Sequence, residues 1–82
     1  MRLLQAYILV NTKPNMLWKV SEAALKIEGV EMAHAVTGEY DVIIYTKFPS
    51  MKDLRKLIEK IQSIDGVIRT QTAMVIPLRL EE

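Results

Sequence analysis

The chain has 82 residues, enough for a single domain over residues 1–82 but too few for a second hydrophobic core. It contains no cysteine and one histidine, which excludes disulfides and a structural zinc site built from four Cys and His ligands. The net charge of +1 and the lack of an apolar run of roughly 18 residues argue against direct nucleic-acid binding and against a membrane span, so we expect a cytoplasmic protein.

The first half of the chain predicts a strand, a helix and a second strand. Residues 3–11 are a short apolar run rich in β-forming residues. Residues 12–15 are typical of a turn, and their Thr and Asn side chains can cap a helix. Apolar residues then recur at helical spacing, at Leu17, Val20, Ala24 and Ile27. Gly29 ends this helix, and residues 30–37 predict the second strand.

The second half repeats this pattern after a tight connection at residues 38–40. Residues 41–47 predict a third strand. Ser50 and Asp53 resemble a capping box at the start of a second helix. The apolar stripe of that helix is Leu54, Leu57, Ile58, Ile61 and Ile64. Gly66 ends the helix, and residues 67–77 predict the fourth strand, followed by a tail at 78–82.

This order of elements predicts an α+β fold, the ferredoxin-like βαββαβ sandwich. The same helix-to-strand joint occurs twice, as Ile-Glu-Gly-Val at 27–30 and as Ile-Asp-Gly-Val at 64–67. Each half is therefore a β-α-β unit. Two interleaved units with right-handed crossovers place both helices on one face of a four-stranded antiparallel sheet.

The predicted sheet is apolar on both faces, which is unusual when helices cover only one of them. If Ala6, Ile8 and Val10 face the helices, Tyr7 and Leu9 point outward. The third strand also alternates two apolar rows, 42/44 and 43/45, and residues 73–76 of the fourth do the same. Five tail residues cannot cover four strands, and a domain this small hides only roughly 60% of its unfolded surface. We therefore predict a face-to-face dimer of the α/β-barrel type.

Other motifs give little support for catalysis or for a cofactor. His34 lies within an apolar strand, where a histidine is more typical of a packed or edge residue than of a general base. The 3 glycines form no phosphate-binding loop, and no Cys-x-x-Cys pair is present. Trp18 lies off the helical stripe, and we expect it to flank the core rather than to anchor another subunit. We predict no catalytic residues, no metal site and no cofactor.

The segment Val-Thr-Gly-Glu-Tyr-Asp at 36–41 is the best candidate for ligand chemistry. Gly38 permits a backbone conformation that other residues resist and allows a ligand to approach closely. Tyr40 offers a ring with a polar tip, and Asp41 offers a carboxylate that can pair with an ammonium group. A plain hairpin turn between two strands explains the same composition.

Followed by the apolar strand at 42–44, this segment closely resembles the signature of the effector domain of Lrp/AsnC-type transcription regulators, the RAM domain. Gly66-Val67 followed by Thr70-x-Thr72 resembles the fourth strand of that family, and Lys13-Pro14 matches before the first helix. The likeness covers nearly the whole chain. Family regulators also carry an N-terminal helix-turn-helix domain, for which this sequence leaves no room. The resemblance therefore implies a stand-alone RAM protein.

The resemblance further implies dimers through the sheet faces, rings of dimers such as octamers, and an amino acid effector at the contact between dimers. The implied ligand-binding residues are Gly38, Glu39, Tyr40, Asp41, Thr70, Thr72 and His34. Asp41 would accept from the ammonium group of the ligand, while the threonine hydroxyls and backbone N–H groups near Gly38 would bind its carboxylate. Mixed assembly with full-length Lrp/AsnC-like regulators would link binding to transcription.

Three alternatives remain. A structural assembly protein with a vestigial pocket would form the same ring, and Asp41→Ala would leave its assembly and melting unchanged. A small dimeric-barrel enzyme would need a His or an acid pair lining a cavity between the helices and the sheet. An ACT domain binds amino acids with the same topology, but its ligand loop follows the first strand, where this chain has residues 11–14.

Overall fold

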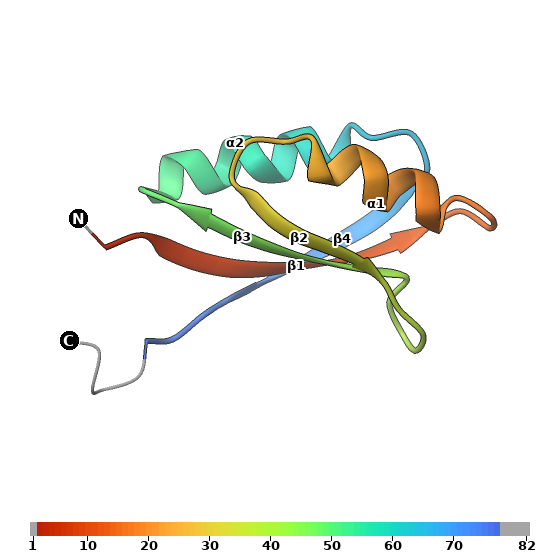
Figure 1. The fold of residues 1–82 in the computed structure, drawn as a ribbon, viewed down its shortest axis with the longest axis horizontal. Helices are drawn as coiled ribbons and strands as arrows, with labels where there is room; N and C mark the ends of the chain where they lie inside the picture. Colours follow the sequence, from red (N-terminus) through yellow and green to blue (C-terminus); the bar gives the residue numbers. More distant parts are fainter. Residues whose placement is uncertain (1, 78–82) are drawn as a thin grey trace.

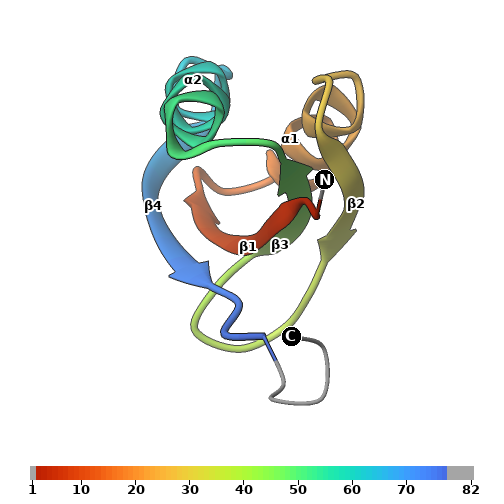
Figure 2. The same ribbon diagram turned by 90° about the vertical axis from the view of Figure 1, so that its left-hand side faces the viewer.

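The structure, a computed structural model that describes residues 2–77, is a four-stranded antiparallel sheet with two helices on one face (Figures 1 and 2). In chain order the elements are β1 Leu4–Thr12, α1 Leu17–Leu25, β2 Val30–Ala35, β3 Val42–Phe48, α2 Met51–Gln62 and β4 Val67–Met74. The strand order is β2-β3-β1-β4, so β1 and β3 are central and β2 and β4 form the edges. The predicted ferredoxin-like α+β fold is confirmed.

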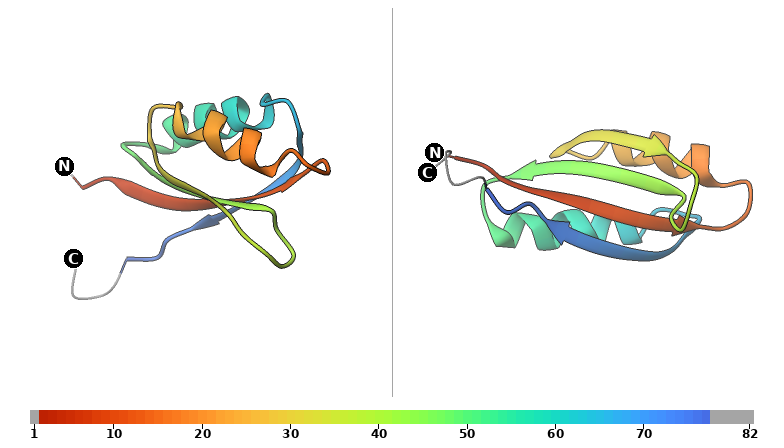
Figure 3. Two further views of the ribbon diagram at one scale, coloured as in Figure 1. Left: turned by 45° about the vertical axis from the view of Figure 1, so that its right-hand side comes forward. Right: turned by 90° about the horizontal axis from the view of Figure 1, so that it is seen from below.

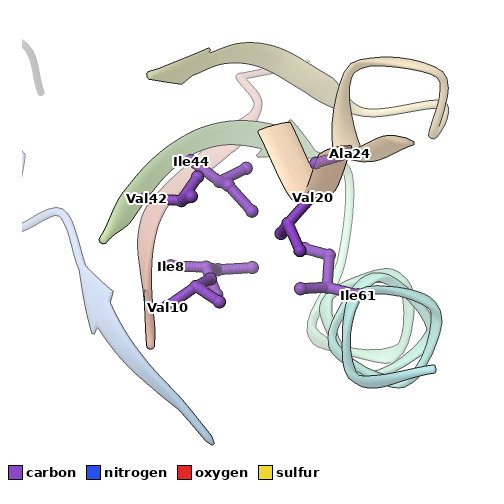
Figure 4. Packing of buried hydrophobic residues seen from close by; sticks show 7 residues of the cluster. All are labelled: Ile8, Val10, Val20, Ala24, Val42, Ile44 and Ile61. Carbon is purple, nitrogen blue, oxygen red and sulfur yellow. The ribbon is translucent and has the colours of Figure 1, made fainter. Parts of the chain in front are cut away.

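The core lies between the helices and the sheet, because alternate residues of the two central strands point toward the helices. Its main cluster consists of Ile8, Val10, Val20, Ala24, Val42, Ile44 and Ile61, all fully buried (Figure 4). A second cluster joins Ala6 and Phe48 to Leu54 and Leu57 of α2. Full burial of each large aliphatic side chain stabilises the fold by about 1.5–3 kcal/mol. The helical and two-residue spacings read from the sequence therefore identify the core correctly.

The repeated helix-to-strand joints at 27–30 and 64–67 have the same geometry. In each, the N–H of the last residue donates to the carbonyl oxygen of the first, at 3.1 and 3.2 Å. Gly29 and Gly66 both adopt a left-handed backbone, with φ of 98° and 102°. Side chains other than glycine resist this conformation, so the repeated glycine is required by the turn itself.

Several predicted element ends lie too far along the chain. The first helix ends at Leu25 rather than at Ile27. The second strand ends at Ala35, where its ladder with β3 stops and the chain enters the connection at 36–41. The fourth strand ends at Met74 rather than at residue 77, and the predicted tail at 78–82 lies outside the described residues.

The two helix starts differ in how they are capped. Ser50 caps α2 as predicted, since its side chain accepts from the N–H of Asp53. The predicted Thr or Asn cap of α1 is wrong: Met16 occupies the N-cap position and makes no side-chain cap, while Asn15 adopts a φ of 66°. The expected packing of Trp18 against the core is also wrong, because its off-stripe position leaves it 69% exposed.

The sheet face away from the helices, which is seen from below in Figure 3 (right), carries the second apolar row that the sequence predicts. Antiparallel pairing sets Tyr7 opposite Tyr45 and Leu9 opposite Ile43, and the two tyrosine rings lie 5.1 Å apart. We call this surface the open face; its apolar residues are Tyr7, Leu9, Met32, Ile43, Tyr45 and Ala73. Among residues 2–77, no helix is long and apolar enough to cross a membrane.

Candidate functional site

Residues 36–41 connect β2 to β3 in a hairpin that reaches below the open face at one end of the sheet (Figure 3, left). The N–H of Val36 donates to the carbonyl oxygen of Asp41 at 2.9 Å and closes the connection. Gly38 has a φ of 112°, and apart from its two neighbours in the chain no atom of the described residues lies within 4 Å of the position that a Cβ there would take. The tip of the hairpin therefore presents an accessible backbone with no side chain in front of it.

Asp41 anchors the hairpin to the end of β1. Its carboxylate oxygen Oδ2 accepts from the N–H of Thr12 at 2.8 Å, and its own N–H donates to the carbonyl oxygen of Val10 at 2.9 Å. The carboxylate forms no other hydrogen bond within residues 2–77. One oxygen is therefore used for structure, and the other is available to a ligand.

This contact changes what an Asp41→Ala variant can decide. The structural alternative predicts unchanged melting, but the substitution removes the acceptor of a partly buried N–H within a single chain. Leaving such a donor unpaired costs about 1–3 kcal/mol. The variant is therefore destabilised whether or not a ligand binds, and it does not separate the two hypotheses.

Side chains of β1 and β4 hold the rest of the hairpin in place. The hydroxyl of Tyr40 donates to Oε1 of Gln71, and the side-chain amide of Asn11 donates to the carbonyl oxygen of Glu39 at 2.7 Å. Arg69 in turn donates to Oδ1 of Asn11 at 3.3 Å. The hairpin is thus fastened to two strands and not only to its own ends.

Sequence reasoning missed Asn11, Arg69 and Gln71, because it treated the hairpin as one continuous motif. A usable signal existed, because the pairing of β1 with β4 places all three on the open face. Polar side chains at alternate positions of an otherwise apolar face mark the place where a polar partner packs against it.

The two predicted threonines lie on the other face of the sheet from Tyr40 and Gln71. Thr70 pairs with Val10 and Thr72 with Ile8, two residues that point toward the helices. The hydroxyl of Thr70 accepts from the side-chain amide of Gln62 in α2 at 3.1 Å. A single chain therefore does not bring the threonines and the hairpin together.

His34 is exposed on the open face of the edge strand β2, opposite Ile43. Of the predicted site residues, the fold of one chain gathers only the four consecutive ones, 38–41. No group of three or more His, Asp or Glu side chains within the described residues could hold a metal ion.

Comparison with known proteins gives this fold and hairpin a family context. A model of the Lrp/AsnC ligand-binding domain matches residues 5–79. The chain belongs to the Lrp/AsnC ligand-binding domain family. The resemblance derived from the hairpin, the fourth strand and the turn before α1 is therefore confirmed.

Relatives of this Lrp/AsnC domain include regulators and solved structures. The HTH-type transcriptional regulator LysM of Sulfurisphaera tokodaii is 30% identical over 74 residues, which are 89% of this chain and 53% of that protein. The hypothetical protein PHS023 of Pyrococcus horikoshii is 32% identical, with a TM-score of 0.83 and 93% of both chains covered. The transcriptional regulator NMB0573 of Neisseria meningitidis, solved as a complex with L-Met, is 25% identical, with a TM-score of 0.79 and 90% of this chain and 50% of that chain covered.

This Lrp/AsnC domain spans about half the length of the curated relatives that it matches. Those relatives are named as transcriptional regulators and not as enzymes.

Proposed function

We propose that this chain is an amino-acid-binding effector module of the Lrp/AsnC type, which acts by assembly and carries out no chemistry. The observation on which the proposal depends is the hairpin at 38–41, which contacts with β1 and β4 hold in place and which presents an open backbone tip at Gly38. Two further findings support it: the match to a ligand-binding domain family and the L-Met complex of the related regulator. The regulator relatives also support the expected cytoplasmic location.

In this proposal the ligand is held at a contact between copies. The unused oxygen of Asp41 accepts from the ammonium group, and backbone N–H groups around Gly38 donate to the carboxylate. Thr70 and Thr72 face away from the hairpin of their own chain, so their hydroxyls reach a ligand only from a neighbouring copy. Glu39, Tyr40 and His34 complete the proposed set.

The proposed assembly begins with a dimer through the open face. This surface is apolar at its centre, with Leu9 and Ile43 paired between the two tyrosines and the hairpin, and Tyr7 and Met32 on it remain exposed. An apolar patch on one face of a small domain is typical of a protein interface. Rings of such dimers, including octamers, and mixed rings with full-length relatives would then bring the threonines of one dimer to the hairpin of the next.

A thermal-shift screen over the common amino acids tests the ligand. A ligand present at about 100 times its Kd adds roughly 2.7 kcal/mol of stability, which raises the Tm of a domain of this size by roughly 10 °C or more. We expect one amino acid, or a small group of similar ones, to give such a shift. Flat melting curves for all of them would contradict the proposal.

A pair of threonine variants tests the placement of the ligand. Thr72→Val removes a hydroxyl of the proposed set while keeping a side chain of similar shape, so the ligand-induced shift should shrink while the Tm without ligand changes little. Thr37→Val makes the same change at an exposed residue next to Gly38 that is outside the set, and the full shift should remain. Equal shifts in both variants would remove Thr72 from the site.

A structural assembly protein with a vestigial pocket is the second candidate. It is favoured by the hydrogen bonds that Tyr40 and Asp41 already make within one chain. Light scattering and melting curves together distinguish the two candidates. The structural protein is expected to be an oligomer whose mass and Tm do not change with any amino acid.

A further inference from the structure

The proposed amino acid site supplies the carboxylate of Asp41 for the ammonium group of the ligand, but it includes no Lys or Arg for the carboxylate of the ligand. A carboxylate removed from water at a contact between copies is costly unless its charge is compensated. A cation on the same surface as Thr70 and Thr72 would provide that compensation.

One flank of α2 lies beside Thr70 and Thr72, which we call the threonine row. The helix α2 is the neighbour of β4 and runs in the opposite direction (Figures 1 and 2). The side-chain amide of Gln62 donates to the hydroxyl of Thr70 at 3.1 Å, so the flank of α2 that carries Gln62 faces the row. Arg55 precedes Gln62 by seven residues, or two helical turns, and therefore lies on the same flank.

The rise of the helix and of the strand brings Arg55 close to the threonine row. A helix advances about 1.5 Å per residue, so Arg55 lies about 10 Å along α2 from Gln62. A strand advances about 3.4 Å per residue, so Thr72 and Met74 lie about 7 Å and about 14 Å beyond Thr70. Arg55 is therefore level with the part of β4 between Thr72 and Met74.

The guanidinium group of Arg55 is available to a ligand. The side chain is exposed, and it forms no ion pair with an Asp or Glu among residues 2–77. Glu59 follows one turn later on α2, but an acidic residue on the C-terminal side of its basic neighbour is in the weaker of the two orders. Arg69 lies on the open face, where it donates to Asn11 at 3.3 Å. Arg55 is thus the arginine that can reach a carboxylate beside the threonine row.

The side chains next to Arg55 on this surface are apolar. Ile58 lies one turn away on the same flank of α2 and is partly buried against the core. Met74 continues the threonine row, because it pairs with Ala6 on the helix side of the sheet, and it is 41% exposed. Methionine adapts to apolar groups of different shapes, and neither side chain can compensate a charge. A ligand whose carboxylate contacts Arg55 would place its own side chain against these two residues.

On the basis of the amino-acid-binding function proposed above, we infer that Arg55 binds the carboxylate of the ligand, and that Ile58 and Met74 restrict the ligand to amino acids with an apolar side chain. Arg55 and the threonine row of one copy hold the carboxylate, while Asp41 in the hairpin of a neighbouring copy holds the ammonium group. Leucine and methionine have the two charges and the apolar chain that this arrangement requires. Lysine and glutamate add a charge that it leaves without a partner.

Isothermal titration calorimetry with four amino acids tests the ligand class. We expect L-leucine or L-methionine to bind at least tenfold more tightly than L-lysine and L-glutamate. A polar or charged amino acid that binds more tightly than both apolar ones would overturn the selection by Ile58 and Met74 and leave the proposed function intact. No binding of any common amino acid would remove the proposed function as well.

The amides of the apolar probes test the role of Arg55. L-leucinamide and L-methioninamide keep the ammonium group and the side chain but lack the negative charge, so each should bind the parent protein about tenfold more weakly than its amino acid. In R55Q this difference should shrink to within threefold, because the amino acid loses affinity and the amide does not. R55K keeps the charge and should recover part of the difference.

The variant K56Q is the matched control for R55Q. Lys56 is the next residue on α2, but it lies toward the joint between α1 and β2, where it is close to Glu28 and Gly29. This variant has the same net charge as R55Q and should keep the tenfold preference for the amino acid over its amide. If R55Q keeps that preference, or if K56Q loses it equally, Arg55 does not bind the carboxylate. Melting curves and light-scattering masses establish that both variants fold and assemble.

Discussion

Asp41 can take part in both structure and binding because the two oxygens of its carboxylate have different surroundings. One oxygen accepts from the N–H of Thr12 and ties the hairpin to β1. The other is unused within residues 2–77 and can accept from a cationic group. Removing the side chain abolishes both roles at once, whereas a substitution that keeps an oxygen acceptor and removes the charge separates them.

The variant Asp41→Asn therefore tests the residue better than Asp41→Ala. The amide oxygen keeps an acceptor for Thr12, so the free energy of unfolding should fall by less than about 1 kcal/mol, while loss of the charge abolishes the amino-acid-induced Tm shift. Asp41→Ala should lose about 1–3 kcal/mol, seen as a Tm lower by roughly 4–24 °C. Glu39→Ala is the control for stability, because the exposed side chain of Glu39 forms no hydrogen bond within residues 2–77. Its free energy of unfolding should stay within about 0.5 kcal/mol of that of the parent protein. An Asn variant as unstable as the Ala variant would contradict this division of roles.

At the scale of the elements, glycines in the same left-handed conformation have different surroundings. Gly66, at the joint between α2 and β4, packs against the start of α1: a Cβ there would lie 3.1 Å from Met16 Cβ and 3.3 Å from Val20 Cγ2. Gly38 has a similar φ, but a Cβ there would meet nothing within 4 Å. Replacement of Gly66 is therefore opposed by both backbone conformation and packing. Replacement of Gly38 is opposed by backbone conformation alone.

Alanine at these two positions should therefore have unequal effects. Gly38→Ala should cost about 1–2 kcal/mol, the price of a left-handed backbone for a residue with a Cβ. Gly66→Ala adds steric overlap with α1, and its total cost should be about 2–4 kcal/mol. Urea unfolding of the two variants measures the difference. Equal losses would show that α1 moves aside freely at this joint.

Capping of α2 allows a second prediction at this scale. Ser50 is the N-cap, and its side chain is hydrogen-bonded to both the N–H and the carboxylate of Asp53. Ser50→Ala should lower the free energy of unfolding by about 1 kcal/mol. Ser63→Ala, at the exposed C-terminal end of the same helix, should have a smaller effect in the same urea titration. The reverse order of stabilities would contradict the capping role.

At the scale of the whole molecule, the open face is the feature that one chain leaves incomplete. Helices cover the other face of the sheet and bury its core, while Tyr7 remains 40% exposed and Met32 43% exposed. Burial of apolar surface at about 25 cal/mol per Å² is the main favourable contribution available to a second copy. The proposed dimer therefore depends on the centre of this face.

A charge placed at that centre should prevent assembly. Leu9→Arg puts an unpaired cation opposite Ile43, so light scattering should give a mass near 9.4 kDa in place of the dimer or larger oligomer expected of the parent protein. Leu25→Arg introduces the same substitution on α1, at a side chain that is already 51% exposed, and should leave the mass of the parent unchanged. A parent protein that is itself monomeric at micromolar concentration would rule out the proposed assembly.

The amino-acid sequence by itself determined the order of the elements, the core and the apolar open face. These follow from spacings within each segment, such as Ile8 and Val10 on one side of a strand and Tyr7 and Leu9 on the other, and such spacings depend only on local geometry. The repeated joints at 27–30 and 64–67 likewise marked the turns that follow the two helices, because a left-handed glycine turn is also a local feature.

Only the tertiary structure decided how the polar residues of the hairpin are used. The partner of Asp41 lies 29 residues away and that of Tyr40 lies 31 residues away, so both depend on how the hairpin is placed against strands that are distant from it in the sequence. The register between β1 and β4 likewise places Thr70 and Thr72 on the helix side of the sheet. Alternation along one strand separates its residues into two sets, but pairing with neighbouring strands is needed to decide which set faces which side.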